Sequence, residues 1–224
     1  MLPGFLKIEM IKIIDCGSQL TQNIARRVRE LGVYTEIVPF NTKASDILNG
    51  DLEGIIISGG QFSVYDENAP IFSRNILKSR VPILGICYGQ QSIAYLLGGK
   101  VSPVRNREYG RTLVRKIEDS PILVGISSDE FNVWMSHGDI VEELPKGFRI
   151  TSRSENNHIS SIEDDDRKIY AVQFHPEVDH TEYGREILDN FLNVCDARRN
   201  WDPEKDYDRI VAETEEKIKE RQNY

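Results

Sequence analysis

The chain has 224 residues, of which 39% are hydrophobic and 29% charged, and a formal net charge of −8. This length and composition fit a globular protein with one ordinary-to-large domain, alone or with an appendage. The acidic balance, without any block of Lys and Arg, argues against nucleic acid or an anionic membrane as a partner. No uninterrupted apolar run approaches the length of a membrane span.

The first half alternates patterns typical of strands and helices. Helix 21–31 ends before Gly32, and residues 54–58 and 81–86 are apolar runs typical of strands that are covered on both faces. This alternation predicts right-handed βαβ units and a parallel sheet. The predicted elements are strand 11–14, helix 21–31, strand 34–40, helix 44–49, strand 54–58, a helix from Pro70, strand 81–86 and helix 90–97.

The second half is richer in strands. Strands are predicted at 112–117, 131–137, 148–154, 158–163 and 169–175, with a last helix at 181–195. The charge run at 163–168 is interpreted as a solvated hairpin tip. We therefore expect an α/β fold with an open, mostly parallel sheet flanked by helices and an additional small antiparallel region.

Three segments are predicted. Residues 1–9 are an N-terminal extension without the basic region or cleavage site of a signal peptide, because the first clear strand pattern begins at Met10. Residues 10–197 form the domain. Residues 198–224 form a charged tail in which Asp202 and Pro203 suit a helix start and the apolar residues form one narrow stripe. Such a helix has no core of its own, so we expect it to lie against another part or lead to a further segment.

The three cysteines are far apart and have no CxxC spacing, which argues against disulfides and a metal site and favours a reduced cytoplasmic protein. Cys16 and Cys195 are interpreted as core or helix-face thiols. Cys87 lies in Gly85–Gly89, GICYG, which matches the G-x-S-x-G spacing of a nucleophile at a strand–helix turn, with Cys in place of Ser. The start of a helix favours a thiolate there. The alternative is a buried thiol in a turn.

A partner base is offered by VQFHPE. His175 and Glu177 are two residues apart, so an extended backbone projects them to the same side, and Pro176 places them at the end of a strand. Ligands bind at the carboxyl ends of the strands in open parallel sheets, so this motif and Cys87 are expected to meet. The three residues would then form a Cys–His–Glu relay, in which Cys87 is the nucleophile, His175 transfers protons and Glu177 fixes the tautomer of the imidazole. The alternative is a surface histidine beside a proline turn. His158 and His180 are interpreted as surface residues and not as ligands.

Two further motifs fit this chemistry. The amide of Tyr88 can hold an oxyanion, and Gly59 and Gly60 let a second amide approach a ligand; the alternative for the two glycines is a plain turn. In WMSHGD, at the expected end of a strand, Ser136, His137, Gly138 and the following aspartate have groups that can hold an amino-acid zwitterion. The alternative is an ordinary polar loop.

Together, GICYGQQ, VQFHPEV and SGGQFSVY resemble the class I glutamine amidotransferases, a flavodoxin-like family with a catalytic triad. The N-terminal DCGSQLTQNIARRVRELGVYTEI, REYG at Arg107–Gly110 and WMSHGD are similar to the glutaminase domain or subunit of GMP synthases. The resemblance extends from Ile11 to about Tyr207. Gln61 stands where the family usually has proline, and Cys16 where it usually has phenylalanine.

The resemblance implies that glutamine is hydrolysed to glutamate and ammonia by Cys87, His175 and Glu177. It implies that Gly60 or Gly59 and Tyr88 hold the oxyanion, and that four residues grip glutamine: Gln91, Ser136, His137 and Gly138. The ammonia would pass to an ATP-pyrophosphatase synthetase domain or subunit that converts xanthosine monophosphate to GMP in purine biosynthesis. ATP and magnesium would bind there, and this chain would need no cofactor or metal.

The SGGVDS loop of such a synthetase is absent from these 224 residues, and the tail resembles the connector that precedes it in fused enzymes. Two alternatives remain open at this point. The chain could feed a different synthetase, or it could be a non-catalytic docking module on the same fold.

Overall fold

One mixed sheet of nine strands forms the centre of the described chain, in the order β2-β1-β3-β4-β9-β8-β7-β5-β6. The structure is a computed structural model and describes residues 9–202, apart from the side chains of residues 105 and 106. Nearly all of the predicted extension 1–9, and the tail from residue 203, lie outside the described residues. No helix within residues 9–202 is both long and apolar enough to cross a membrane.

The first five strands in this order are parallel, as the alternation of strands and helices predicts. Isoleucines from neighbouring strands pair at the centre, for example Ile55 with Ile83, and their side chains are fully buried. This is the apolar pattern of strands that are covered on both faces. The parallel strands are β2 (Thr35–Pro39), β1 (Met10–Asp15), β3 (Leu52–Ile57), β4 (Ile83–Ile86) and β9 (Ile169–Val172).

The antiparallel part is larger than predicted. Four of the eight strand pairings within residues 9–202 are antiparallel, so the expectation of a mostly parallel sheet with a small antiparallel region is only partly right. Short turns join β6 to β7, β7 to β8 and β8 to β9, whereas a longer segment joins β5 to β6. Because β9 pairs with both β8 and β4, the two halves form one sheet. The antiparallel strands are β8 (Ile159–Asp164), β7 (Arg149–Ser154), β5 (Lys100–Lys116) and β6 (Glu130–Glu143).

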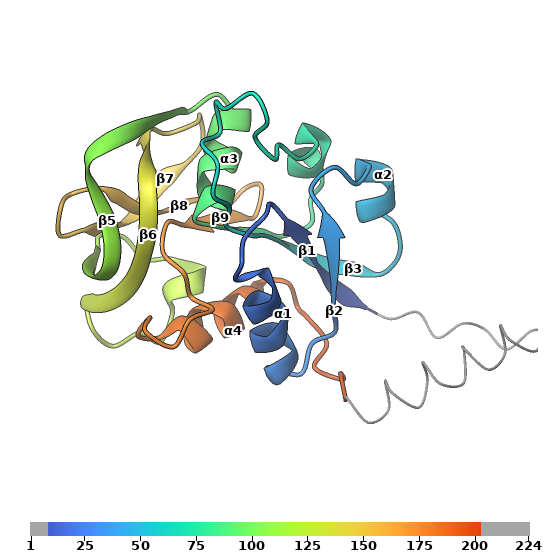
Figure 1. Cartoon of the computed structure of the whole chain (residues 1–224). Helices are drawn as coiled ribbons and strands as arrows, with labels where there is room; N and C mark the ends of the chain where they lie inside the picture. Colours follow the sequence, from blue (N-terminus) through green and yellow to red (C-terminus); the bar gives the residue numbers. More distant parts are fainter. Residues whose placement is uncertain (1–8, 203–224) are drawn as a thin grey trace, which may run out of the picture.

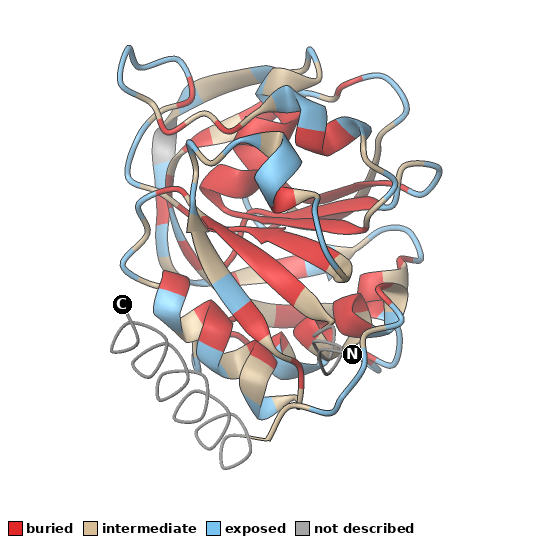
Figure 2. Cartoon of the chain, turned by 90° about the vertical axis from the view of Figure 1, so that its right-hand side faces the viewer, coloured by how far each residue is buried: buried red, intermediate tan, exposed pale blue. Residues whose placement is uncertain are grey.

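Helices cover both faces of the parallel half (Figure 1). The helix α1 (Thr21–Glu30) and the helix α4 (Gly184–Val194) pack on one face, while α3 (Tyr88–Leu96) and the short α2 (Ala44–Ile47) lie on the other. Along β1, Ile13 belongs to the first core cluster and Ile14 to the second, as strand alternation requires. Figure 2 shows the buried residues concentrated in the strands and on the inner sides of the helices.

The predicted helix from Pro70 is wrong. Phe72 packs into the core with 2% of its surface exposed, and the chain is still extended at Ser73. Only the short 3-10 helix η1 (Arg74–Lys78) follows before β4; a second 3-10 helix, η2 (Pro121–Leu123), precedes β6. Burial of the phenylalanine side chain therefore outweighs the helix-start signal of the proline.

The edge strand β6 curves back to the segment that follows β9. The amide of His175 donates to the Trp134 carbonyl oxygen at 3.0 Å, and the amide of Glu182 donates to the Asn132 carbonyl oxygen at 2.9 Å. Figure 1 shows β5 and β6 as long, bent strands. This curvature carries Ser136 to the turn after β4. WMSHGD lies inside β6, which continues to Glu143, and not at the end of a strand as predicted, because its residues pair with β5.

Candidate active site

The turn between β4 and α3 holds Cys87 in a backbone conformation that few side chains adopt. Its φ is 53° and its ψ is −106°, a region that favours glycine. A Cβ on Gly85 would lie 2.6 Å from Ile93 Cδ1. One on Gly89 would lie 2.5 Å from the Ile57 carbonyl oxygen. The two glycines thus allow the close strand–helix contact of a nucleophile elbow, with Cys87 at its strained corner.

Polar groups surround the Cys87 sulfur, which belongs to a residue that is only 4% exposed. The Sγ atom lies 3.8 Å from the Ser136 carbonyl oxygen and 3.6 Å from the Nε2 atom of Gln173. A thiol can donate to the carbonyl, whereas a thiolate can only accept, and the amide of Gln173 can donate to it. The sulfur also stands at the start of α3, whose amide N–H groups favour negative charge.

His175 follows β9 and lies beside Cys87, across Gly59. A Cβ on Gly59 would lie 3.2 Å from His175 Cε1 and 3.7 Å from Cys87 Cβ, so the side chains of His175 and Cys87 both lie next to Gly59. The Nδ1 atom of His175 lies 2.8 Å from the Oε1 atom of the buried Glu177. This contact leaves Nε2 as the ring nitrogen that is available to the sulfur.

The surroundings of His175 favour its protonated form. Burial alone would lower the pKa of His175, but the charges of Cys87 and Glu177 and hydrogen bonds to both residues raise it well above its usual value. The backbone of His175 is anchored as well, because the Thr181 hydroxyl donates to the His175 carbonyl oxygen at 2.6 Å. A protonated imidazole beside a sulfur anion is the arrangement of an activated thiol.

A pocket of about 390 Å³ opens at the sulfur. Gly59 and Tyr88 are not among its lining residues. Tyr88 nevertheless packs against Gly60, because a Cβ on Gly60 would lie 3.2 Å from the Tyr88 ring. Tyr88 is also the first residue of α3, so its amide N–H has no acceptor inside the helix. The residues expected from the sequence that line the pocket are Gly60, Cys87, Gln91, Ser136, His137 and Gly138.

Gln91 on α3 connects the pocket wall to β6. Its Nε2 atom donates to the Asp139 carbonyl oxygen at 2.8 Å and to Gln173 Oε1 at 3.2 Å, which leaves its own Oε1 atom for a ligand. The Asp139 carboxylate accepts hydrogen bonds from the hydroxyls of Ser63 and Tyr65. These bonds fasten the segment 61–65, which includes the exposed Gln61, at the rim of the pocket.

A second buried carboxylate lies behind His137. The His137 Nε2 atom is 2.9 Å from Glu108 Oε2, and its Nδ1 atom is 3.1 Å from the Asp139 carbonyl oxygen. Burial would raise the pKa of Glu108, but hydrogen bonds from His137, Ser154 and Asn156 lower it to about 2. Both ring nitrogens contact oxygen atoms of the protein, and the ring is held from two sides. The ring therefore serves as a fixed wall of the pocket.

Comparisons with known proteins show the family of this chain. The family model described as glutamine amidotransferase class-I matches residues 12–195. The chain belongs to the class I glutamine amidotransferase family. A Thermoplasma acidophilum structure, described as that of a GMP synthase subunit, has a TM-score of 0.74 at 35% identity, covering 85% of this chain and 96% of that one. A glutamine amidotransferase from Thermotoga maritima shares the fold, with a TM-score of 0.62 at 21% identity. The match covers 83% of this chain and 81% of that one.

Curated relatives carry the name GMP synthase [glutamine-hydrolyzing]. The protein from Caldicellulosiruptor saccharolyticus is 50% identical over 194 residues, which are 86% of this chain and 38% of that protein. The protein from Clostridium tetani is 45% identical over 216 residues, 96% of this chain and 41% of that protein. The chain thus spans about two fifths of the length of the curated relatives it matches.

Two residues of the candidate site were missed by sequence reasoning. Gln173 contacts the sulfur, and Glu108 contacts His137. The signal for Gln173 was available, because it precedes His175 by two residues and strand alternation projects both to the same side. Glu108 lies within the REYG motif, but its pairing with His137 depends on the register of β5 against β6.

The remaining histidines and cysteines differ in outcome. His180 is exposed and its ring lies 4.8 Å from that of Trp134, as expected of a surface residue. The prediction for His158 is wrong, because its side chain is 17% exposed and its Nδ1 atom lies 3.3 Å from Glu108. Cys16 and Cys195 are buried thiols, as interpreted from the sequence.

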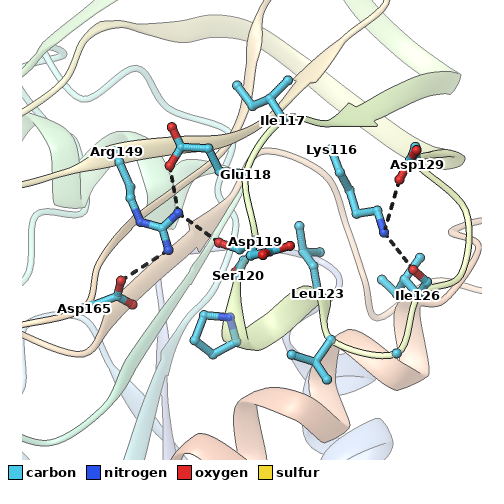
Figure 3. A pocket seen from close by; sticks show the side chains of 13 residues that line it. Lys116, Ile117, Glu118, Asp119, Ser120, Leu123, Ile126, Asp129, Arg149 and Asp165 are labelled. Atoms are coloured by element: carbon cyan, nitrogen blue, oxygen red, sulfur yellow. Dashed lines mark hydrogen bonds and ion pairs between the residues drawn. The ribbon is translucent and has the colours of Figure 1, made fainter.

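Another depression, of about 1120 Å³, lies where β5 and β7 meet the segment around η2 (Figure 3). Its cations are bonded within the depression: Arg149 to Glu118 and Asp165, and Lys116 to the Ile126 carbonyl oxygen. Its lining contains neither cysteine nor histidine. The depression therefore lacks the cysteine and histidine found at the first pocket, and its two basic side chains are already bonded to protein groups.

Replacement of Glu108 by Gln is expected to raise KM for glutamine about tenfold, because His137 loses a charged acceptor in a buried place. kcat should fall less, since Glu108 does not touch the reacting atoms. Steady-state glutaminase kinetics measure both constants. Glu118→Gln, which removes an exposed carboxylate at the far depression, is the control and should leave both unchanged. An unaltered KM in Glu108→Gln would show that His137 needs no such support.

Proposed function

We propose that this chain hydrolyses glutamine to glutamate and ammonia through Cys87, His175 and Glu177. The carrying observation is the strained turn at Cys87 beside a histidine whose Nδ1 atom is held at 2.8 Å by a buried carboxylate. Stability of the fold does not explain why the cysteine, the histidine and the carboxylate lie together, because a buried ion pair contributes little to the free energy of folding. Nucleophilic catalysis uses all three groups.

Acylation begins when the Cys87 thiolate attacks the side-chain carboxamide carbon of glutamine. The carbonyl oxygen becomes an oxyanion, which accepts hydrogen bonds from the amide of Tyr88 and that of Gly60 or Gly59. The protonated His175 then gives its proton to the departing nitrogen. The C–N bond breaks, ammonia leaves, and a glutamyl thioester remains on the sulfur.

Deacylation uses the same residues in reverse. The neutral His175 takes a proton from water, and the oxygen attacks the thioester carbon. The C–S bond breaks, glutamate leaves, and the thiolate is restored beside a protonated His175. Glu177 keeps the proton of the neutral ring on Nδ1, so that Nε2 faces the reacting atoms in both halves.

The pocket beside the sulfur supports an amino-acid substrate. Its volume of about 390 Å³ is within the range of small-molecule sites. In this proposal Gln91 accepts a hydrogen bond from the α-ammonium of glutamine. Ser136, Gly138 and the wall formed by His137 hold the α-carboxylate, which leaves the side chain of the substrate pointing to Cys87.

We propose further that the ammonia serves a synthetase that converts xanthosine monophosphate to GMP, in the cytoplasm. The curated relatives named GMP synthase, 50% and 45% identical, support this partner. ATP and magnesium would bind in that synthetase, whether it is a fused domain or a separate protein, and take no part in the hydrolysis. A different synthetase is the second candidate, and a docking module without catalysis is the third.

The experiment measures glutamate and GMP formation by the chain with and without a GMP-forming synthetase. Glutamine, xanthosine monophosphate, ATP and magnesium are supplied, with ammonium salt in place of glutamine as the control for synthetase activity. We expect GMP to form from glutamine only when both proteins are present. Glutamate without glutamine-dependent GMP would favour a different synthetase. No glutamate under any condition would favour the docking module.

A further inference from the structure

The Cys87 sulfur has a second partner besides His175, and the reaction as derived so far does not use it. Gln173 lies just after β9, is fully buried, and places its Nε2 atom 3.6 Å from Sγ. Its backbone is anchored, because its amide donates to the Ser160 carbonyl oxygen at 2.8 Å. The side chain is therefore held at the reacting atom by the sheet itself.

A backbone carbonyl determines which end of the Gln173 amide faces the sulfur. The Asp139 carbonyl oxygen can only accept a hydrogen bond, so the Gln91 atom that lies 2.8 Å from it is the NH₂ group. That same NH₂ group lies 3.2 Å from Gln173, which must present its oxygen there. The NH₂ group of Gln173 is then the end that points to Sγ.

This orientation selects one state of the sulfur. A thiol could share its hydrogen with the Ser136 carbonyl oxygen, 3.8 Å away, and needs no donor. A thiolate needs donors, and the amide of Gln173 provides one that cannot lose its proton at any ordinary pH. His175, in contrast, gives up its proton during the reaction, so of these two side chains Gln173 is the one that remains a donor throughout.

We propose that Gln173 is a further catalytic residue, whose side-chain amide donates to the Cys87 thiolate before the attack and again when the thiolate leaves the glutamyl thioester. This inference rests on the proposed glutaminase chemistry. No bond to Gln173 forms or breaks. Its hydrogen bond strengthens as negative charge returns to sulfur, which makes the sulfur a better leaving group in deacylation.

Alkylation of Cys87 by iodoacetamide tests the donor without requiring turnover. The rate follows the thiolate population, and the mass of the Cys87 peptide identifies the product. The other thiols do not interfere: burial raises the pKa of Cys16 to about 12 and raises that of Cys195 far above its usual value. The rate is measured from pH 5 to pH 10 on the full chain.

Gln173→Met keeps the length of the side chain and removes the donor. We expect the midpoint of the alkylation profile to rise by roughly one to two pH units, and the rate at pH 6 to fall about ten- to a hundredfold. Gln90→Met is the matched control, because Gln90 is an equally buried amide that donates to the Ala171 carbonyl oxygen and not to the sulfur. Its profile should superimpose on that of the unmodified chain.

Gln173→Glu provides a second variant of nearly the same shape, in case the methionine side chain prevents folding. Its carboxylate would repel the thiolate, so the midpoint should rise at least as far. Thermal unfolding establishes that each variant is folded. A folded Gln173 variant with an unshifted profile would overturn the proposal for this residue while leaving Cys87 as nucleophile. Hydrolysis that survives Cys87→Ala would instead overturn the proposed function itself.

Discussion

Cys87→Ala is expected to abolish glutamine hydrolysis, with a loss on the order of 10⁶-fold. The variant removes the only atom that can form the thioester, while the pocket, Gln91 and the segment 61–65 keep their contacts. Release of glutamate, followed with the synthetase present, is the measurement. The loss should appear in kcat and not in KM, because the sulfur contributes little to holding the α-ammonium and α-carboxylate groups of glutamine.

The fold should survive this change. Alanine at position 87 removes one sulfur atom and keeps the same unfavourable φ of 53°. Cys87→Gly provides a check on the strain: it should be equally inactive and at least as stable as Cys87→Ala, because glycine adopts this backbone region freely. Thermal midpoints compare the two. Detectable turnover in a folded Cys87→Ala chain would show that another group attacks the substrate.

His175→Asn is expected to lower kcat by about 10² to 10⁴-fold, the range of general acid–base catalysis. The pH dependence is the more specific result. The pKa of His175 is raised well above its usual value, so the proton needed by departing ammonia is retained through neutral pH and lost only at higher pH. Turnover should therefore stay level near pH 6.5 and decline only well above it.

Glu177→Gln tests the cause of that shift. Removal of the carboxylate charge makes the protonated ring less favourable, so the pKa of His175 falls and the decline in turnover begins at lower pH. His180→Asn is the control, because that histidine is exposed beside Trp134. A pH–rate profile of Glu177→Gln that declines at the same pH as that of the unmodified chain would refute the coupling of the two residues.

Short-range geometry explains what could be predicted from the sequence. The two glycines around Cys87 specify a tight turn wherever the strand lies, and the spacing of His175 and Glu177 places them on one side of an extended chain. Both inferences use neighbours within a few residues. The apolar strands of the parallel half were predictable for the same reason, since burial on both faces leaves a continuous run of isoleucine.

Long-range pairing explains what could not be predicted. β6 reaches the turn at Cys87 only because a nine-stranded sheet curves back on itself, and no local pattern in residues 130–143 records that curvature. The pair of Glu108 and His137 depends on the register of two long strands with an irregularity between Pro103 and Glu108. Helix signals at Pro70 gave way to the burial of Phe72, a tertiary contact.

The most direct test of the account is chemical labelling with a chloroketone analogue of glutamine, whose electrophilic carbon occupies the position of the carboxamide. The chain is incubated with the analogue in the presence of the synthetase, digested, and analysed by peptide mass. With Cys87 as the single attacking group, the adduct should appear on the peptide containing Cys87, and excess glutamine should slow its formation. An adduct on any other residue, or an unlabelled Cys87 peptide in a chain that is hydrolysing glutamine, would contradict the account.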